Sequence, residues 1–150
     1  MKPTIALICG LLIASLAACG DRGGRRAGDK GSTEAKQSEA AAFEAAQAWL
    51  ELIDSGNYGE SWEEAAAYFR GQVGKEQFVQ AMEATRPPLG ELVKRELSSK
   101  EYRTALSGAP DGHYMVALFR TSFTGKQDAV ETVTAMLDSD EWRVAGYFIK

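Results

Sequence analysis

The proline pair Pro87-Pro88, followed closely by Gly90, divides the sequence into two parts with different hydrophobic periods. Proline lacks a backbone N–H and clashes with the preceding helical turn, so a helix cannot continue through this point. Apolar residues recur at steps of three and four before the prolines and tend to alternate after them. This order predicts an α+β chain in which helices cover one face of a sheet.

Three helices are expected before the prolines, and each has an apolar face. The first ends at Ser55-Gly56, where glycine favours a helix stop. The second begins after Asn57, a residue that can cap a helix, and ends before Gly71. The third spans about residues 74–85. The residues expected on the buried faces are Phe43, Ala46, Leu50, Ile53, Trp62, Ala65, Ala66, Phe69, Phe78, Ala81 and Met82.

Four strands are expected after Gly90. The first alternates weakly over residues 92–97 and can continue to residue 106. Stronger alternation marks residues 113–123, 129–137 and 142–149. Short links join these last three strands, which is typical of an antiparallel meander. The predicted fold class is therefore α+β, with three N-terminal helices packed on a curved antiparallel sheet of about four strands.

The N-terminal segment predicts export. Residues 1–18 begin with a short positive region at Lys2 and continue as an apolar stretch of signal-peptide length, too short for a mature membrane-spanning helix. Its end, Leu16-Ala17-Ala18-Cys19, resembles the lipobox of bacterial lipoproteins. The resemblance implies cleavage before Cys19 and acylation of its thiol, which anchors a protein stably on a bilayer. The alternative is an ordinary secretory signal that ends by chance in a cysteine.

Cleavage at this point would divide the chain into a signal peptide (1–18), a lipidated Cys19 with a flexible, glycine-rich and charged tether to residue 38, and one α+β domain (39–150). Cys9 would leave with the signal peptide, so the mature domain would have no free thiol for a disulfide, a nucleophile or a metal site. The chain also has only one histidine. We therefore expect neither a metal nor another cofactor.

Charge and the residue after the lipobox indicate location and partners. The net charge of −4 and the pI of about 5.1 argue against a nucleic-acid partner. Gly20 stands where an aspartate would be expected in enteric lipoproteins retained at the inner membrane. This similarity implies an extracytoplasmic protein, lipid-anchored on the periplasmic side of the outer membrane. The pattern does not indicate an oligomeric state.

Four segments of the helix–sheet region resemble the bacterial family called domain of unknown function 4019. The similarity covers about residues 40–150. Its name carries no activity, so the resemblance transfers no catalytic residue. The order of helices and strands is also similar to the cone-like nuclear transport factor 2 fold, by analogy alone. The segments that carry the family resemblance are Arg86-Pro87-Pro88-Leu89-Gly90, Pro110-Asp111-Gly112-His113-Tyr114, Glu131-Thr132-Val133-Thr134 and Trp142-Arg143-Val144-Ala145-Gly146-Tyr147.

Strand register gives the sharpest hypothesis for a site. A turn centred near Gly125-Lys126 would place Arg120 opposite Glu131, with Tyr114 on the same face. An arginine there could bind a carboxylate or phosphate ligand in a cone-fold pocket. The alternative is a structural cross-strand pair. A slip of one residue would move the side chains to the opposite face. Extending this face to the last strand adds Trp142, Val144 and Phe148.

Trp62 lies in an aromatic-rich stretch with Tyr58, Tyr68 and Phe69. Such a stretch can form a ligand cavity or partner surface, or it can be ordinary core packing. His113, two residues after Asp111, could transfer protons, although a lone histidine at the start of a strand is usually a surface residue.

No catalytic motif is recognisable, so the sequence predicts a non-enzymatic lipoprotein of the cell envelope that binds an envelope protein or a small ligand. The second hypothesis is a small-molecule-binding or acid–base enzyme whose pocket holds Tyr114, Arg120 and Glu131. The third is a structural role in envelope assembly or stress tolerance.

Overall fold

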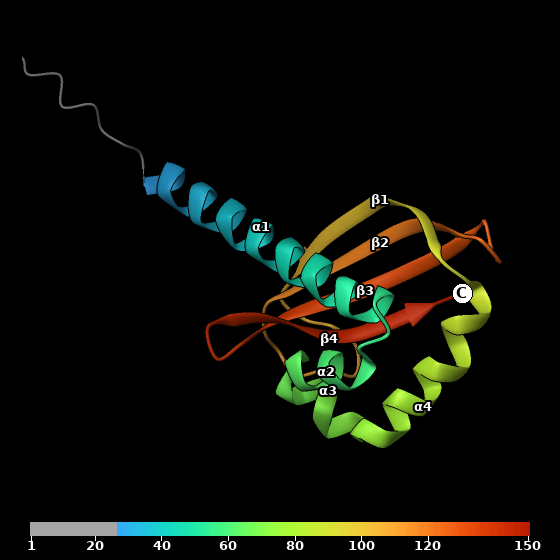
Figure 1. Cartoon of the computed structure of the whole chain (residues 1–150). Helices are drawn as coiled ribbons and strands as arrows, with labels where there is room; N and C mark the ends of the chain where they lie inside the picture. Colours follow the sequence, from blue (N-terminus) through green and yellow to red (C-terminus); the bar gives the residue numbers. More distant parts are fainter. Residues whose placement is uncertain (1–26) are drawn as a thin grey trace, which may run out of the picture.

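The computed structural model describes the backbone of residues 27–150 and the side chains from residue 38 onward. The predicted signal peptide, Cys19 and the beginning of the tether lie outside the described residues. Helices precede a four-stranded sheet, which confirms the α+β class (Figure 1). The elements are α1 (Ala27–Asp54), α2 (Tyr58–Glu64), α3 (Ala67–Gln72), α4 (Lys75–Thr85), the 3₁₀ turn η1 (Pro87–Leu89), β1 (Leu92–Arg103), β2 (Tyr114–Phe123), β3 (Ala129–Asp138) and β4 (Glu141–Ile149).

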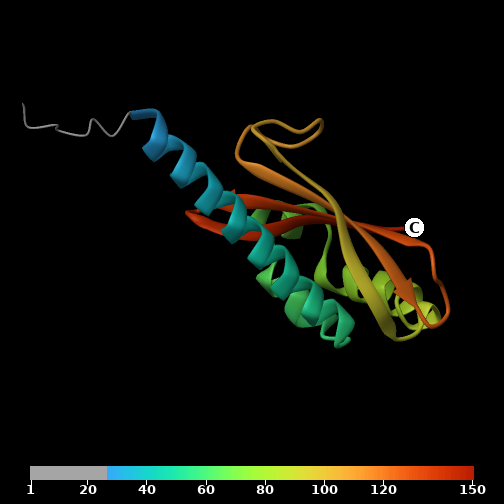
Figure 2. The same cartoon turned by 90° about the horizontal axis from the view of Figure 1, so that it is seen from above.

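Helix α1 begins inside the predicted tether, at Ala27. The flexible chain predicted up to residue 38 is therefore helical over its second part, and this end of the helix extends beyond the sheet (Figures 1 and 2). Ala35, Lys36 and Gln37 favour helix. The packed turns from Ala42 onward supply the nucleus, so each further residue adds a hydrogen bond at little cost.

The predicted second helix is two short helices, because the backbone opens at Ala65 and Ala66. Both residues have extended ψ angles, of 159° and 148°, and both are fully buried. The amide N–H of Ala66 donates to the carbonyl of Val144 in β4 at 2.8 Å. A hydrogen bond to the edge of the sheet thus replaces a helical one.

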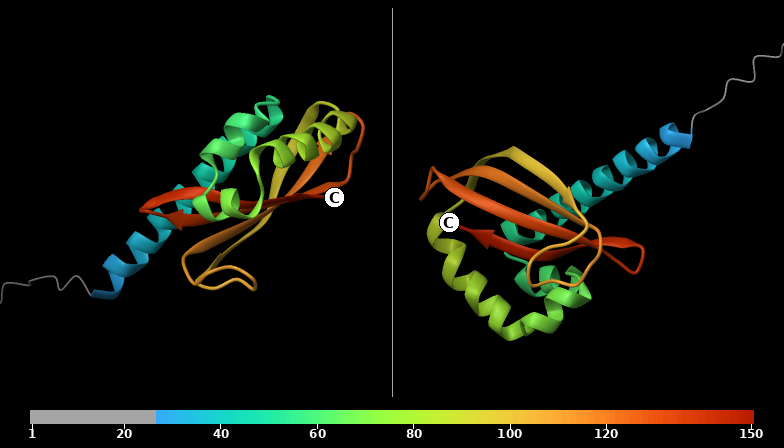
Figure 3. Two further views of the ribbon diagram at one scale, coloured as in Figure 1. Left: turned by 90° about the horizontal axis from the view of Figure 1, so that it is seen from below. Right: turned by 180° about the vertical axis from the view of Figure 1, so that it is seen from behind.

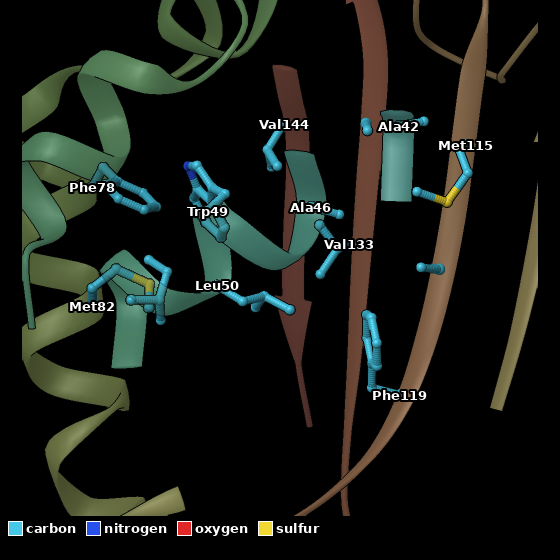
Figure 4. Close-up of a cluster of buried hydrophobic side chains, with 13 residues drawn as sticks. Ala42, Ala46, Trp49, Leu50, Phe78, Met82, Met115, Phe119, Val133 and Val144 are labelled. Carbon is cyan, nitrogen blue, oxygen red and sulfur yellow. The ribbon is translucent and has the colours of Figure 1, made fainter. Parts of the chain in front are cut away.

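All neighbouring strands are antiparallel, in the order β1-β2-β3-β4, which confirms the meander. Helices α2, α3 and α4 lie on one side of the twisted sheet (Figure 3). Figure 4 shows Trp49 and Leu50 of α1 pointing toward Val133 and Val144 of the sheet. Ala42 and Ala46 are fully buried, and their small side chains let α1 approach the strands closely.

The predicted register of β2 and β3 is wrong by one residue. Glu131 pairs with Phe119, and Arg120 pairs with Val130. The turn between these strands docks on the end of η1, where local turn preferences could not place it: the N–H of Gly125 donates to the carbonyl of Leu89 at 2.8 Å. A Cβ at Gly125 would lie 2.9 Å from that oxygen, so only glycine allows this approach.

A bulge in β4 changes the face of Phe148. Thr134 pairs with Gly146, whereas Ala135 pairs with Val144, so Ala145 is the extra residue. The predicted placement of Phe148 on the buried face is therefore wrong: its side chain is 59% exposed. Trp142 and Val144, before the bulge, share the face of Ala135 as predicted.

Candidate functional site

Four charged side chains meet near the C-terminal end of α1: Asp54, Arg86, Arg95 and Glu131, together called the charge network. Asp54 is the last residue of α1, Arg86 follows α4, Arg95 lies in β1 and Glu131 in β3. A carboxylate at a helix C-terminus is disfavoured by the helix dipole. The two arginines offset this effect: Arg95 joins α1 to the sheet, and Arg86 joins α1 to the end of α4.

Arg95 connects the two carboxylates of the network. Its Nη1 and Nη2 donate to Asp54 Oδ2 and Oδ1 at 2.6 and 2.9 Å. Its Nε and Nη2 donate to Glu131 Oε2 and Oε1 at 2.7 and 3.1 Å. Burial by itself would lower the pKa of Arg95, but the hydrogen bonds to Asp54 and Glu131 outweigh burial and raise it. Arg95 is therefore a permanent cation with both edges of its guanidinium engaged.

The carboxylate of Glu131 is fully buried and fully hydrogen-bonded. Besides the two bonds from Arg95, it accepts from Thr121 Oγ1 and from the hydroxyl of Tyr147, each at 2.6 Å. Burial tends to raise the pKa of Glu131, but the bonds from Arg95, Thr121 and Tyr147 lower it overall. Burial, followed by the charge of Glu131, raises the pKa of Tyr147. Glu131 thus stays ionised and Tyr147 stays a donor.

Arg86 is also buried but makes far fewer hydrogen bonds than Arg95. Its side chain is 5% exposed, and Nη2 donates to Asp54 Oδ1 at 2.5 Å. The guanidinium carbon lies 4.4 Å from the centre of the Phe123 ring. Its Nε and Nη1 are shielded from solvent, and neither has a hydrogen-bond partner among the described residues. Arg86 therefore has buried N–H groups, on Nε and Nη1, that donate to no atom of the described residues.

Two cavities flank the network. The first, called the Arg86 cavity, has about 380 Å³, and its walls include Ile53, Asp54, Tyr58, Arg86, Glu91 and Leu92. The second, of about 360 Å³, is lined by Phe43, Leu50, Asp54, Arg95, Leu97 and Phe119, among others. Both volumes fall within the range of about 300–1,000 Å³ typical of small-molecule sites. Buried charges beside cavities make this region the candidate site.

The residues predicted for a site do not assemble. Arg120 is exposed on the face opposite Glu131, where its β1 neighbour is Glu96. Tyr114 is buried on the same face as Arg120, and its hydroxyl donates to the carbonyl of Pro110 at 2.5 Å. Trp62 packs against the hydrophobic core and donates from Nε1 to the carbonyl of Val73 at 2.8 Å. Of these four, only Glu131 belongs to the charge network.

Sequence reasoning missed Asp54, Arg86 and Arg95. One signal was available in β1: Arg95 and Leu97 stand two residues apart in an alternating segment, so the arginine shares a face with an apolar residue. The same signal singled out Glu131, two residues before Val133. Asp54 and Arg86 lie at helix ends, and no local pattern separates them from ordinary surface charges there.

Replacing Arg120 by alanine is expected to change the free energy of unfolding by less than about 0.5 kcal/mol, because the side chain is exposed and outside the network. Urea unfolding followed by circular dichroism measures this change. A loss above about 1 kcal/mol would mean that Arg120 makes a buried interaction after all.

Within residues 27–150, no group of three or more histidine, cysteine, aspartate or glutamate side chains could hold a metal ion. No helix in this described part is long and apolar enough to cross a membrane.

Residues 45–147 match the family model described as protein of unknown function, DUF4019. No curated protein and no solved structure matches the chain. The cone-fold analogy therefore stays a prediction.

Proposed function

We propose that this chain, which belongs to the DUF4019 family of unknown function, is a lipid-anchored, non-enzymatic binding domain of the bacterial cell envelope. The proposal has two parts, an anchor at Cys19 and a binding cavity next to the charge network. Each part has separate support and a separate test.

The anchor rests on the sequence around Cys19. An apolar stretch of signal-peptide length ends in Leu16-Ala17-Ala18-Cys19, and small residues stand where lipoprotein processing requires them. Two or three acyl chains would hold the protein stably, whereas a single chain would bind marginally. Gly20 favours transfer to the outer membrane, with the domain on the periplasmic side.

The non-enzymatic part of the proposal is supported by the hydrogen bonds of Glu131, which occupy both oxygens of its carboxylate. A general base needs a free lone pair and a pKa near the working pH. Glu131 has four hydrogen bonds, and their combined effect moves its pKa away from neutrality. Asp54 accepts three bonds from two arginines. These carboxylates hold the fold together, and the adjoining cavity offers donors suited to binding.

The alternative of an acid–base enzyme required Tyr114, Arg120 and Glu131 to meet in one pocket. The observed register separates Glu131 from the other two by the thickness of the sheet. That constellation therefore lends the enzyme hypothesis no support.

We expect radiolabelled palmitate to be incorporated into the full chain expressed in a Gram-negative bacterium, and expect Cys19→Ala to abolish the label. Cys9→Ala is the matched control, because Cys9 lies inside the predicted signal peptide and should leave labelling intact. Density-gradient separation should place the labelled protein in the outer-membrane fraction. Label that persists in Cys19→Ala, or an unlabelled soluble wild type, would refute the anchor.

A further inference from the structure

The two arginines of the charge network differ sharply in how their N–H groups are used. Arg95 donates four hydrogen bonds, whereas Arg86 donates one. A guanidinium has five N–H donors, and the three on Nε and Nη1 of Arg86 have no acceptor among residues 27–150. Buried polar groups without partners are rare and costly, and a buried charge is costlier still. An acceptor that is not part of the described chain would remove this cost.

We propose that the Arg86 cavity binds a small monocarboxylate, whose oxygens supply the acceptors that Arg86 lacks. This inference rests on the proposed function and deepens its binding part by naming the ligand class. Phe123 covers one face of the guanidinium, so the carboxylate approaches in the plane of the N–H groups, as in bidentate arginine–carboxylate pairs.

The charge of the surroundings favours a monoanion. Asp54 and Glu131 balance Arg86 and Arg95, so the network is neutral before a ligand arrives. Glu91 also lies in the cavity wall and would repel a second negative charge. A dianion such as phosphate would meet about twice this repulsion. A single carboxylate gains the guanidinium bonds at a smaller electrostatic cost.

The remaining wall suits a ligand with a short apolar body. Ile53, Pro87 and Leu92 contribute apolar surface. Tyr58 can add a donor: burial raises its pKa, an effect that outweighs the opposing charge of Arg86, so its hydroxyl keeps the proton at neutral pH. The Arg86 nitrogens are shielded without a ligand, and the wall has to open slightly for binding. Leu92, which is 38% exposed, is the side chain best placed to move.

The test is a titration of the detergent-purified full chain with sodium isobutyrate at constant ionic strength, followed by saturation-transfer NMR. Isobutyramide, which has a similar shape but no charge, is the control ligand. We expect isobutyrate to bind and isobutyramide to bind at least about tenfold more weakly. Arg86→Gln should weaken isobutyrate binding by about tenfold or more.

Arg86→Gln could disturb folding, so a second pair of variants leaves the arginine in place. Leu92→Trp should fill part of the cavity that Leu92 lines and abolish binding without lowering the melting temperature, since Leu92 is partly exposed. Val93→Trp is the matched control: it adds the same side chain at the next position, which is 65% exposed and not part of the cavity wall, and binding should be unchanged.

Absence of isobutyrate binding to the wild type would overturn the proposal, as would equal affinity for isobutyramide or unchanged binding in a folded Leu92→Trp variant. None of these results depends on palmitate labelling at Cys19. Failure here with intact labelling would reject the ligand class but leave the envelope anchor standing. Failure of palmitate labelling with intact isobutyrate binding would reject the envelope anchor but leave the ligand class standing.

Discussion

Replacement of Glu131 by glutamine is expected to lower the free energy of unfolding by about 3–5 kcal/mol. The carboxylate is fully buried and accepts bonds from Arg95, Thr121 and Tyr147. A glutamine of the same shape removes the negative charge and replaces one acceptor oxygen by a donor that faces other donors. Arg95 would then have only Asp54 to balance its charge in a largely buried position.

Urea unfolding at neutral pH measures this effect, and Glu101→Gln is the matched control. Glu101 is an exposed glutamate in β1, where the same substitution should cost less than about 0.5 kcal/mol. A loss below about 1 kcal/mol for Glu131→Gln would show that the carboxylate contributes little to the network.

The lowered pKa of Glu131 also predicts how the stability of the protein depends on pH. The pKa of Glu131 in the folded protein lies below its ordinary value of 4.5, so its contribution is present above about pH 4.5 and is lost as the pH falls through the folded pKa. The stability difference between wild type and Glu131→Gln should therefore shrink as the pH is lowered from 4.5. A difference that stays constant down to about pH 3 would contradict this assignment.

Replacement of Gly90 by valine is expected to cost about 2–4 kcal/mol. Gly90 has φ 81° and ψ −162°, a conformation that side chains with a Cβ strongly disfavour. A Cβ there would also lie 2.0 Å from Thr124 Oγ1, which accepts a hydrogen bond from the Glu91 N–H. The substitution therefore adds a steric clash to backbone strain.

Gly108→Val separates these two contributions. Gly108 has a similar φ of 83°, but nothing lies within 4 Å of an added Cβ, so valine there meets backbone strain alone. We expect Gly90→Val to be the more destabilising of the two in thermal and urea unfolding. The double variant Gly90→Val/Thr124→Ala should recover part of the loss. Equal destabilisation at the two glycines would mean that contact with Thr124 is unimportant.

The turn after β2 is also hydrogen-bonded to the residues on both sides of Gly90. The N–H of Thr124 donates to the carbonyl of Glu91, and that of Gly125 donates to the carbonyl of Leu89. Two segments more than thirty residues apart are thus joined. The pairing of β2 with β3 is centred on Gly125, whereas the sequence predicted a centre between Gly125 and Lys126, and this half-residue difference shifts every pair by one residue. That shift moves Arg120 away from Glu131.

Much of the fold could be predicted from local patterns. The change of period at Pro87-Pro88 separates helices from strands, and alternation places Glu131 on the same face as the buried Val133 and Ala135. These two predictions depend only on residues close together in the chain, because a helix repeats every 3.6 residues and a strand every two. The same patterns did not predict that α1 already includes Ala27, or that the helical backbone breaks at Ala65-Ala66.

The partners of Glu131 could not be predicted in this way. Arg95 reaches it from β1 and also binds Asp54 at the end of α1, and Arg86 binds Asp54 from the chain after α4. Their meeting depends on where α1 stops, on the docking of the β2–β3 turn and on the bulge at Ala145, which keeps Tyr147 on the buried face. Periodicity assigns a residue to a face, whereas long-range packing and hydrogen bonds select which residues of separate elements meet there.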